Sequence, residues 1–258
     1  MVIFITFSRK KKDIIISVLR AARGTITQSD DIVLKLQGLL NGCFVQTHYI
    51  PKSLIWFGNS AFDLRGVCGC NPCDVLFFLP AGIRPVKRNL ECLNALAEVH
   101  EIRQCLKVVF AGPVLDAEYG ERFFEALEHC KDFACWIRAI PAEAMRFAYS
   151  GADVVLNTSS SEGFSNVLLE AMAAGRPILA SDIQSNRIAV LGYPGEHPCG
   201  YLFKLENRAD FINQAIKLID NEQTRKSLAE NGLKRSKEWP KPEDEAKLLY
   251  NVYKNAVT

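Results

Sequence analysis

The chain has 258 residues, of which 48% are hydrophobic and 23% charged, and its formal net charge is +2 at pH 7. This composition is typical of a globular protein, and the small net charge argues against a nucleic-acid or anionic-membrane partner. No apolar run reaches the roughly 18–20 residues needed to span a bilayer, so we expect no transmembrane segment. Nine cysteines without a convincing secretory signal indicate reduced thiols and a cytoplasmic location.

The first 50 residues carry no recognisable motif, and we treat residues 1–50 as an N-terminal remnant or divergent segment. Their start places an apolar run, 2–7, before the basic run Arg9–Lys12. A signal peptide has the opposite order, so this start predicts a short strand or helix instead of a targeting sequence.

From residue 74 onward, short apolar runs alternate with patterns of helical period. The predicted strands cover residues 74–80, 106–112, 133–140, 153–157, 178–181 and 200–203. The predicted helices cover 89–102, 117–130, 142–150, the stretch ending at Gly175, 207–219, 221–238 and 241–256, and a loop is expected between 182 and 199. This alternation predicts an α/β fold with a doubly wound, Rossmann-like parallel sheet over residues 51–240 and a closing helix over 241–258.

The stretch Thr158–Pro177 combines a small polar loop with the start of a helix. Free backbone N–H groups and the helix dipole favour an anion at residues 163–166. Carboxylates are poor phosphate ligands, so Glu162 and Glu170, which bracket this point, are expected to bind neutral hydroxyls. A phosphate flanked by hydroxyls describes a nucleotide sugar. The simpler alternative is a capped amphipathic helix whose acids lie in solvent.

A basic loop, Gly82-Ile83-Arg84-Pro85-Val86-Lys87-Arg88, follows the first strand of the predicted sheet. Arg84 and Lys87 would therefore lie at the carboxyl edge, where open α/β sheets bind ligands. Fixed cations there could stabilise the charge that grows on a departing nucleoside diphosphate. A solvated basic loop is the alternative, and the spacing leaves open whether Lys87 or Arg88 faces a phosphate.

The string from Glu162 to Pro177 resembles the donor-site signature of the group 1, family 4 retaining glycosyltransferases, which have the two-lobed GT-B fold. Their E-x7-E motif corresponds here to Glu162 and Glu170. The resemblance implies that Glu162 contacts the sugar hydroxyls and Glu170 the ribose hydroxyls of the nucleotide. It also implies that the backbone of Gly163, Phe164, Ser165 and Asn166 approaches the sugar and the diphosphate, with Arg84 and Lys87 as the cationic clamp.

By this resemblance the chain is a GT-B C-terminal lobe with the N-terminal lobe largely missing, and its terminal helix lacks the lobe onto which it folds in relatives. The implied activity is retaining transfer from a nucleotide sugar to an unknown acceptor, without metal or cofactor. A UDP-sugar is the favoured donor because uridine nucleotides are common among relatives. The alternative is a non-catalytic nucleotide-sugar-binding lobe, truncated or needing a partner subunit that supplies the missing half.

The run Cys68-Gly69-Cys70-Asn71-Pro72-Cys73 resembles a metal-binding cluster at first sight. A structural zinc site needs four ligands, and only three are local, although His48 or Cys43 could complete the set. The run lies in a linker that leads into a strand, so we interpret it as an ordinary loop rather than as a metal or redox site.

Overall fold

The computed structural model describes residues 9–28, 46–192 and 196–257 of the chain. These residues form two compact units, each described here by itself. The sheet unit comprises Trp56–Ser160 and Ser165–Glu238, and the terminal unit comprises Met1–Ile55, Ser161–Phe164 and Trp239–Thr258. No described helix is long and apolar enough to cross a bilayer.

A six-stranded, all-parallel sheet in the order β5-β4-β3-β6-β7-β8 forms the centre of the sheet unit. Its strands are β3 (Val75–Pro80), β4 (Leu106–Ala111), β5 (Ala134–Ile137), β6 (Val154–Asn157), β7 (Ile178–Ser181) and β8 (Gly200–Phe203). The order reverses between β3 and β6, which makes that pair the topological switch point. The predicted doubly wound α/β fold is confirmed.

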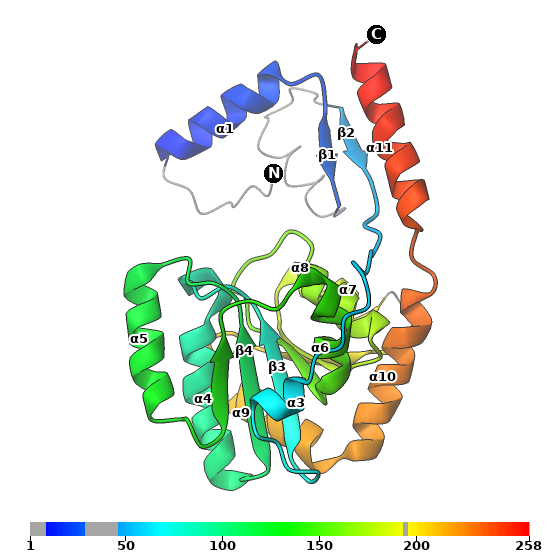
Figure 1. Ribbon diagram of the computed structural model, residues 1–258. Coiled ribbons are helices and arrows are strands. Elements are labelled where there is room, and N and C mark those ends of the chain that lie inside the picture. The colour runs from blue at the N-terminus through cyan, green and yellow to red at the C-terminus, as the bar shows by residue number, and fades with distance from the viewer. Residues whose placement is uncertain (1–8, 29–45, 193–195, 258) are drawn as a thin grey trace. The chain divides into compact units, whose positions relative to one another are not determined.

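Helices cover both faces of this sheet, with α4 and α5 on one side and α6, α7, α8 and α10 on the other (Figure 1). The helices are α3 (Leu64–Val67), α4 (Asn89–Ile102), α5 (Ala117–Glu128), α6 (Met145–Gly151), α7 (Asn166–Ala173), α8 (Gln184–Leu191), α9 (Arg208–Asp220) and α10 (Glu222–Ser236), with 3-10 turns at Pro85–Lys87 and Ala142–Ala144. The expected loop over 182–199 is wrong, because α8 forms there. The buried face of α8 includes Asn186, which donates to the carbonyl and the hydroxyl of Ser181. Because this buried residue is polar, the sequence of α8 lacks the continuous apolar face by which a helix is recognised.

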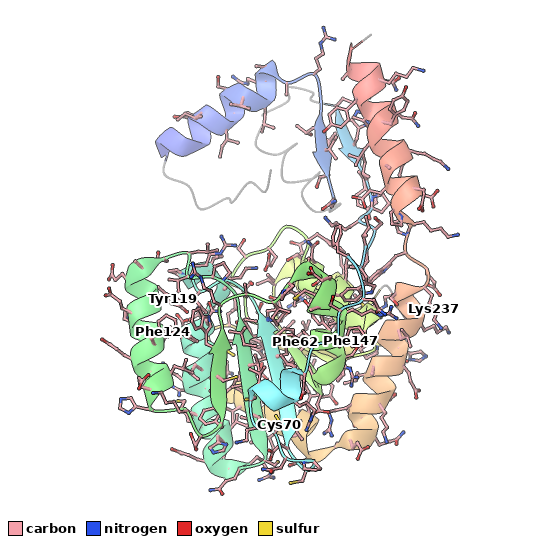
Figure 2. The ribbon with its side chains drawn as sticks, viewed as in Figure 1. Phe62, Cys70, Tyr119, Phe124, Phe147 and Lys237 are labelled. Atoms are coloured by element: carbon pink, nitrogen blue, oxygen red, sulfur yellow. The ribbon has the colours of Figure 1, made fainter. Side chains whose placement is uncertain are left out.

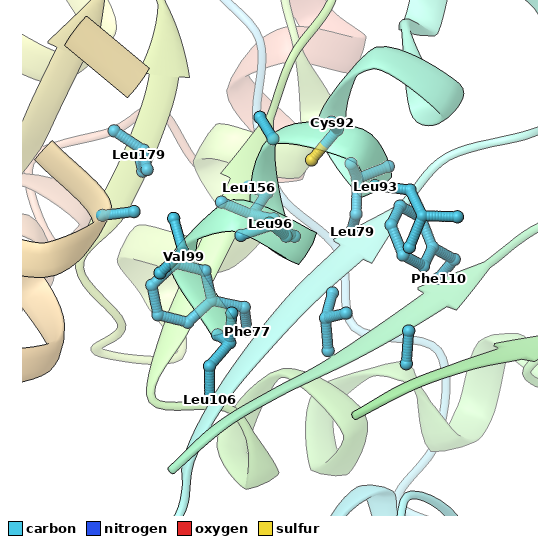
Figure 3. Close-up of a cluster of buried hydrophobic side chains, with 14 of the residues drawn as sticks. Phe77, Leu79, Cys92, Leu93, Leu96, Val99, Leu106, Phe110, Leu156 and Leu179 are labelled. Atoms are coloured by element: carbon cyan, nitrogen blue, oxygen red, sulfur yellow. The ribbon is translucent and has the colours of Figure 1, made fainter. Parts of the chain in front are cut away.

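The core of the sheet unit lies between the sheet and the layer formed by α4, α5 and α9, as the close-up of Leu79, Leu93, Leu96 and Phe110 shows (Figure 3). Five of the six residues of β3 are buried, as expected for a central strand that is covered on both faces. On the opposite face, the Phe78 ring meets the Tyr149 ring of α6 edge-on, at a centroid distance of 5.3 Å.

The terminal unit contains α1 (Arg9–Ala21), the two parallel strands β1 (Thr25–Thr27) and β2 (Thr47–Tyr49), and α11 (Pro242–Val257). Glu245 of α11 accepts hydrogen bonds from the Ser53 backbone N–H at 2.7 Å and from Gln28 Nε2 at 3.3 Å. The terminal helix therefore contacts other residues of its own unit. The predicted apolar run 2–7 and Cys43 lie outside the described residues.

Candidate functional site at the switch point of the sheet

The loops that follow β3 and β6 are joined by hydrogen bonds at the carboxyl edge of the sheet. Thr158 Oγ1 donates to the Lys87 carbonyl at 2.6 Å, and the Ser160 backbone N–H donates to the Val86 carbonyl at 2.9 Å. Because β3 and β6 are the strands between which the order reverses, this is the edge where open α/β sheets bind ligands.

The loop after β3 presents Arg84, which is exposed, and Lys87, which is partly exposed. Asn89, at the start of α4, is fully buried and anchors the backbone of this loop. Its Oδ1 accepts from the Arg84 backbone N–H at 3.3 Å, while its Nδ2 donates to the Ala81 carbonyl at 3.4 Å. The anchoring holds the backbone and leaves the Arg84 side chain on the surface.

Arg88 adopts a left-handed backbone conformation, with φ at 54°. Its guanidinium donates to the Leu205 carbonyl at 3.4 Å and lies 3.8 Å from the Glu206 carboxylate. Arg88 is therefore engaged with the loop between β8 and α9, whereas Arg84 and Lys87 belong to the part of the loop that meets Thr158 and Ser160.

The start of α7 is arranged by Ser165, the residue that precedes the helix. Its side chain does not cap the helix. Instead, Ser165 Oγ accepts a hydrogen bond from Asn157 Nδ2, at the end of β6, at 2.7 Å. Both residues are buried, whereas Asn166 is exposed. A helix start that its own N-cap side chain leaves uncapped retains N–H groups that can bind an anion.

Glu170 lies one turn further along α7 and is held by a buried tyrosine. Tyr149 of α6, which is 0% exposed, donates its hydroxyl proton to Glu170 Oε2 at 2.5 Å. Burial and the neighbouring Glu170 charge raise the pKa of Tyr149 well above its ordinary value, so the phenol stays neutral and remains a donor. The ring is fixed in turn by edge-on contacts with Phe78 and Trp56.

Glu162, Gly163 and Phe164 belong to the terminal unit, although they directly precede Ser165 in the chain. Within the sheet unit, the structure brings Arg84, Lys87, Ser165, Asn166 and Glu170 to one edge of the sheet.

A cavity of about 240 Å³ lies on the α4 side of the same edge. Arg88, Glu91, Thr158, Phe203 and Leu205 are among its lining residues, whereas Arg84, Lys87 and Glu170 are not. Arg84, Lys87 and Glu170 thus lie outside this cavity.

The cysteine run at 68–73 does not form a metal site with the residues that the structure describes. Among residues 9–28, 46–192 and 196–257, no group of three or more His, Cys, Asp or Glu side chains is placed to hold a metal ion.

Comparison with known proteins identifies the family. The model of the glycosyl transferases group 1 family matches residues 73–235, which is more than half of the chain. The chain belongs to this family. A similar curated protein is glycosyltransferase 1 domain-containing protein 1 of Xenopus tropicalis, 26% identical over 156 residues that make up 60% of this chain and 43% of the relative.

Two solved structures are similar in fold to this group 1 family member. Sucrose-phosphate synthase of Thermosynechococcus elongatus gives a TM-score of 0.80 at 21% identity, covering 97% of this chain and 62% of that one. HepE of Anabaena, solved in complex with UDP and glucose, gives a TM-score of 0.77 at 16% identity, covering 96% of this chain and 67% of that one. The match to the curated Xenopus relative spans less than half of that protein's length.

Three residues of the site were not found from the sequence. Tyr149 lies 21 positions before Glu170, and no local pattern connects the two. Asn157 and Thr158 stand at the end of an apolar strand, where polar residues are common. Their buried positions at a sheet edge become informative only once the strand order is known.

Proposed function

We propose that the chain binds a nucleotide-sugar donor at the carboxyl edge of its sheet and takes part in retaining, metal-independent sugar transfer. The observation that carries the proposal is the arrangement at the switch point. There, the loop with Arg84 and Lys87 is bonded to the loop after β6, and the buried Tyr149 hydroxyl holds the Glu170 carboxylate.

Each part has a distinct task in this proposal. Arg84 and Lys87 stabilise the negative charge that develops on the departing nucleoside diphosphate. These two side chains take the place of the metal ion that could otherwise stabilise this charge. The backbone from Gly163 to Asn166 approaches the diphosphate at the start of α7. Glu170 accepts hydrogen bonds from the ribose hydroxyls, and its tyrosine partner fixes its rotamer before the ligand arrives.

Glu162 completes the proposal as the residue that orients the sugar hydroxyls. Its assignment rests on the E-x7-E resemblance and on family membership, because it lies in the terminal unit. A uridine nucleotide is the first ligand to test, since HepE was solved in complex with UDP and glucose.

The second candidate is a nucleotide-sugar-binding lobe that is not catalytic by itself and needs a partner subunit. The observation that favours it is the 43% coverage of the Xenopus relative, which leaves more than half of that protein without a counterpart in the match. Both candidates require the same donor site, and they differ only in turnover.

Calorimetric titration with UDP, GDP and their sugars, in the presence of a chelator, tests the donor site. Glu170→Ala should weaken nucleotide binding by about 1–3 kcal/mol, because a charged hydrogen-bond acceptor is lost. Glu121→Ala, which removes an exposed carboxylate on α5, is the matched control and should leave affinity unchanged.

A well-folded chain that binds no nucleotide refutes the donor site. If binding is found, a transfer assay with the chain alone separates the two candidates. Turnover supports the transferase, whereas binding without turnover supports the dependent lobe.

A further inference from the structure

Two cysteines that are far apart in the sequence come together on the sheet unit, at a place remote from the donor edge. Cys68 follows α3, and Cys135 lies on the edge strand β5. Neither has a role in the proposed sugar transfer, and this inference does not depend on that function. Cys70, in the same loop as Cys68, lies beside α3 (Figure 2).

The alternation of β5 places the Cys135 side chain on the α3 and α6 face of the sheet. Trp136 points to the opposite face, where its ring meets that of Phe124 on α5 edge-on at 4.8 Å. Ala134 also belongs to the core on the α4 and α5 side. Successive side chains of a strand point to opposite faces, so Cys135 points towards the face that α3 covers.

The Cys68 thiol reaches the same position from α3. Cys68 Sγ lies 3.5 Å from the Val108 carbonyl and 3.9 Å from the Phe133 carbonyl. Val108 pairs with Ala134 across β4 and β5, which places this thiol beside the residue that precedes Cys135. These contacts and the strand register make the Cys68 and Cys135 side chains neighbours, and both residues are partly exposed.

The two thiols are unequal. The neighbouring Cys68 lowers the pKa of Cys135 below that of an ordinary thiol, although burial opposes this. The neighbouring Cys135, together with burial, raises the pKa of Cys68. The pair therefore releases its first proton more readily than its second, which leaves a thiolate beside a thiol.

We propose that Cys68 and Cys135 form a redox-sensitive dithiol that hydrogen peroxide oxidises to an intramolecular disulfide. The Cys135 thiolate attacks one oxygen of the peroxide, the O–O bond breaks, and the second oxygen leaves as hydroxide, which gives a Cys135 sulfenic acid. Cys68 then loses its proton and attacks the Cys135 sulfur, so that the S–S bond forms and water leaves. In total, two thiols lose two electrons and two protons, and one peroxide becomes two waters.

The disulfide ties the loop after α3 to the edge strand and encloses β3, α4, β4 and α5 in one covalent loop. A bridge that closes such a long loop restricts the unfolded chain strongly. Oxidation should therefore raise the melting temperature of the sheet unit by roughly 5–10 °C. Cys70, which lies two positions after Cys68 in the same loop, is the competing partner that the test must exclude.

Peptide mapping of the full chain after treatment with hydrogen peroxide tests the pairing. We expect a peptide linked through Cys68 and Cys135, formed at least about tenfold faster in the folded chain than in urea because the fold holds the two thiols together. A dithiol reductant should reverse both the link and the rise in melting temperature.

Three variants make the test specific. Cys68→Ser and Cys135→Ser should each abolish the link and the thermal shift. Cys73→Ser, which changes an exposed cysteine of the same loop, should retain both. A link between Cys68 and Cys70, equal rates in folded and unfolded chains, or no link in a chain with a native circular dichroism spectrum would each overturn the proposal.

Discussion

Removal of the Tyr149 hydroxyl tests the hydrogen bond by which this residue holds Glu170. Tyr149→Phe keeps the ring and its edge-on contacts with Phe78 and Trp56, at centroid distances of 5.3 and 6.0 Å. It deletes only the hydroxyl that donates to Glu170 Oε2 at 2.5 Å. The substitution leaves no buried polar atom of its own without a partner, so its cost reports the hydrogen bond.

The loss of stability expected for Tyr149→Phe depends on how deeply Tyr149 and Glu170 are buried. A hydrogen bond to a charged group contributes about 1.5–3 kcal/mol, but Glu170 is partly exposed and water can replace the lost donor. We therefore expect Tyr149→Phe to reduce the free energy of unfolding by about 1–2 kcal/mol. Release of the Glu170 rotamer should also weaken UDP binding roughly two- to tenfold, because the side chain must then be ordered on binding.

Urea denaturation and calorimetry measure these two effects, and a double-mutant cycle with Glu170→Gln separates the pair from the rest of the site. We expect a coupling free energy of about 1 kcal/mol or more between the two positions. Tyr250→Phe, at an exposed tyrosine of α11, is the control and should change neither quantity. Additive single mutants and unchanged UDP affinity would refute the view that Tyr149 positions Glu170.

Three further predictions concern Arg84, the ion pair between Arg65 and Asp153, and the stability of the fold at high pH. Arg84→Met should weaken UDP binding but leave uridine binding unchanged in calorimetry, because only the diphosphate meets this cation. Arg65→Met removes a partly buried ion pair of 2.7 Å with Asp153 and should lower the free energy of unfolding in urea by about 1–3 kcal/mol, whereas Lys131→Met, at an exposed pair, should cost less than about 0.5 kcal/mol. The raised pKa of Tyr149 contributes stability that is fully present below the unfolded pKa of about 10 and is lost progressively as the pH rises from there towards the folded pKa. Tyr149→Phe should therefore flatten the alkaline loss of stability by up to about 1.4 kcal/mol per pH unit.

The sequence predicts the parts of this fold that depend on the local periodicity of hydrophobic residues and on the residues that end helices and strands. The apolar run at 178–181 and the helix at 89–102 have the bounds that the structure gives to β7 and α4. Strand runs that alternate with amphipathic helices already imply a parallel sheet, and a parallel sheet places the loop with Arg84 at the edge that receives α7. The placement of Arg84 and Lys87 at this edge could therefore be predicted from the sequence, whereas their roles are proposals.

Contacts between distant segments could not be predicted in this way. The Tyr149–Glu170 bond and the Cys68–Cys135 pair depend on which strands are neighbours, and local period carries no information on strand order. The contact of α11 with Ser53 could not be predicted for the same reason, because Glu245 and Ser53 are 192 positions apart in the chain.

A buried polar network explains how the carboxyl edge of the sheet is held in one shape. Asn157 donates to Ser165 Oγ at 2.7 Å and accepts from the Ser159 backbone N–H at 3.2 Å, while Ser181 Oγ donates to the Ser159 carbonyl at 2.6 Å. The ends of β6 and β7 and the start of α7 are thereby joined through side chains that are all buried.

Buried polar groups are costly unless they are paired, so this network fixes one geometry for the loop after β6. Asn157 also donates to the Ser165 hydroxyl oxygen, and this hydroxyl does not cap the N–H groups of α7. The Ser165 side chain is thus part of the network that orders the edge and leaves the N–H groups at the start of α7 to other acceptors. A ligand that carries a diphosphate would use those donors together with Arg84, on an edge arranged before it binds.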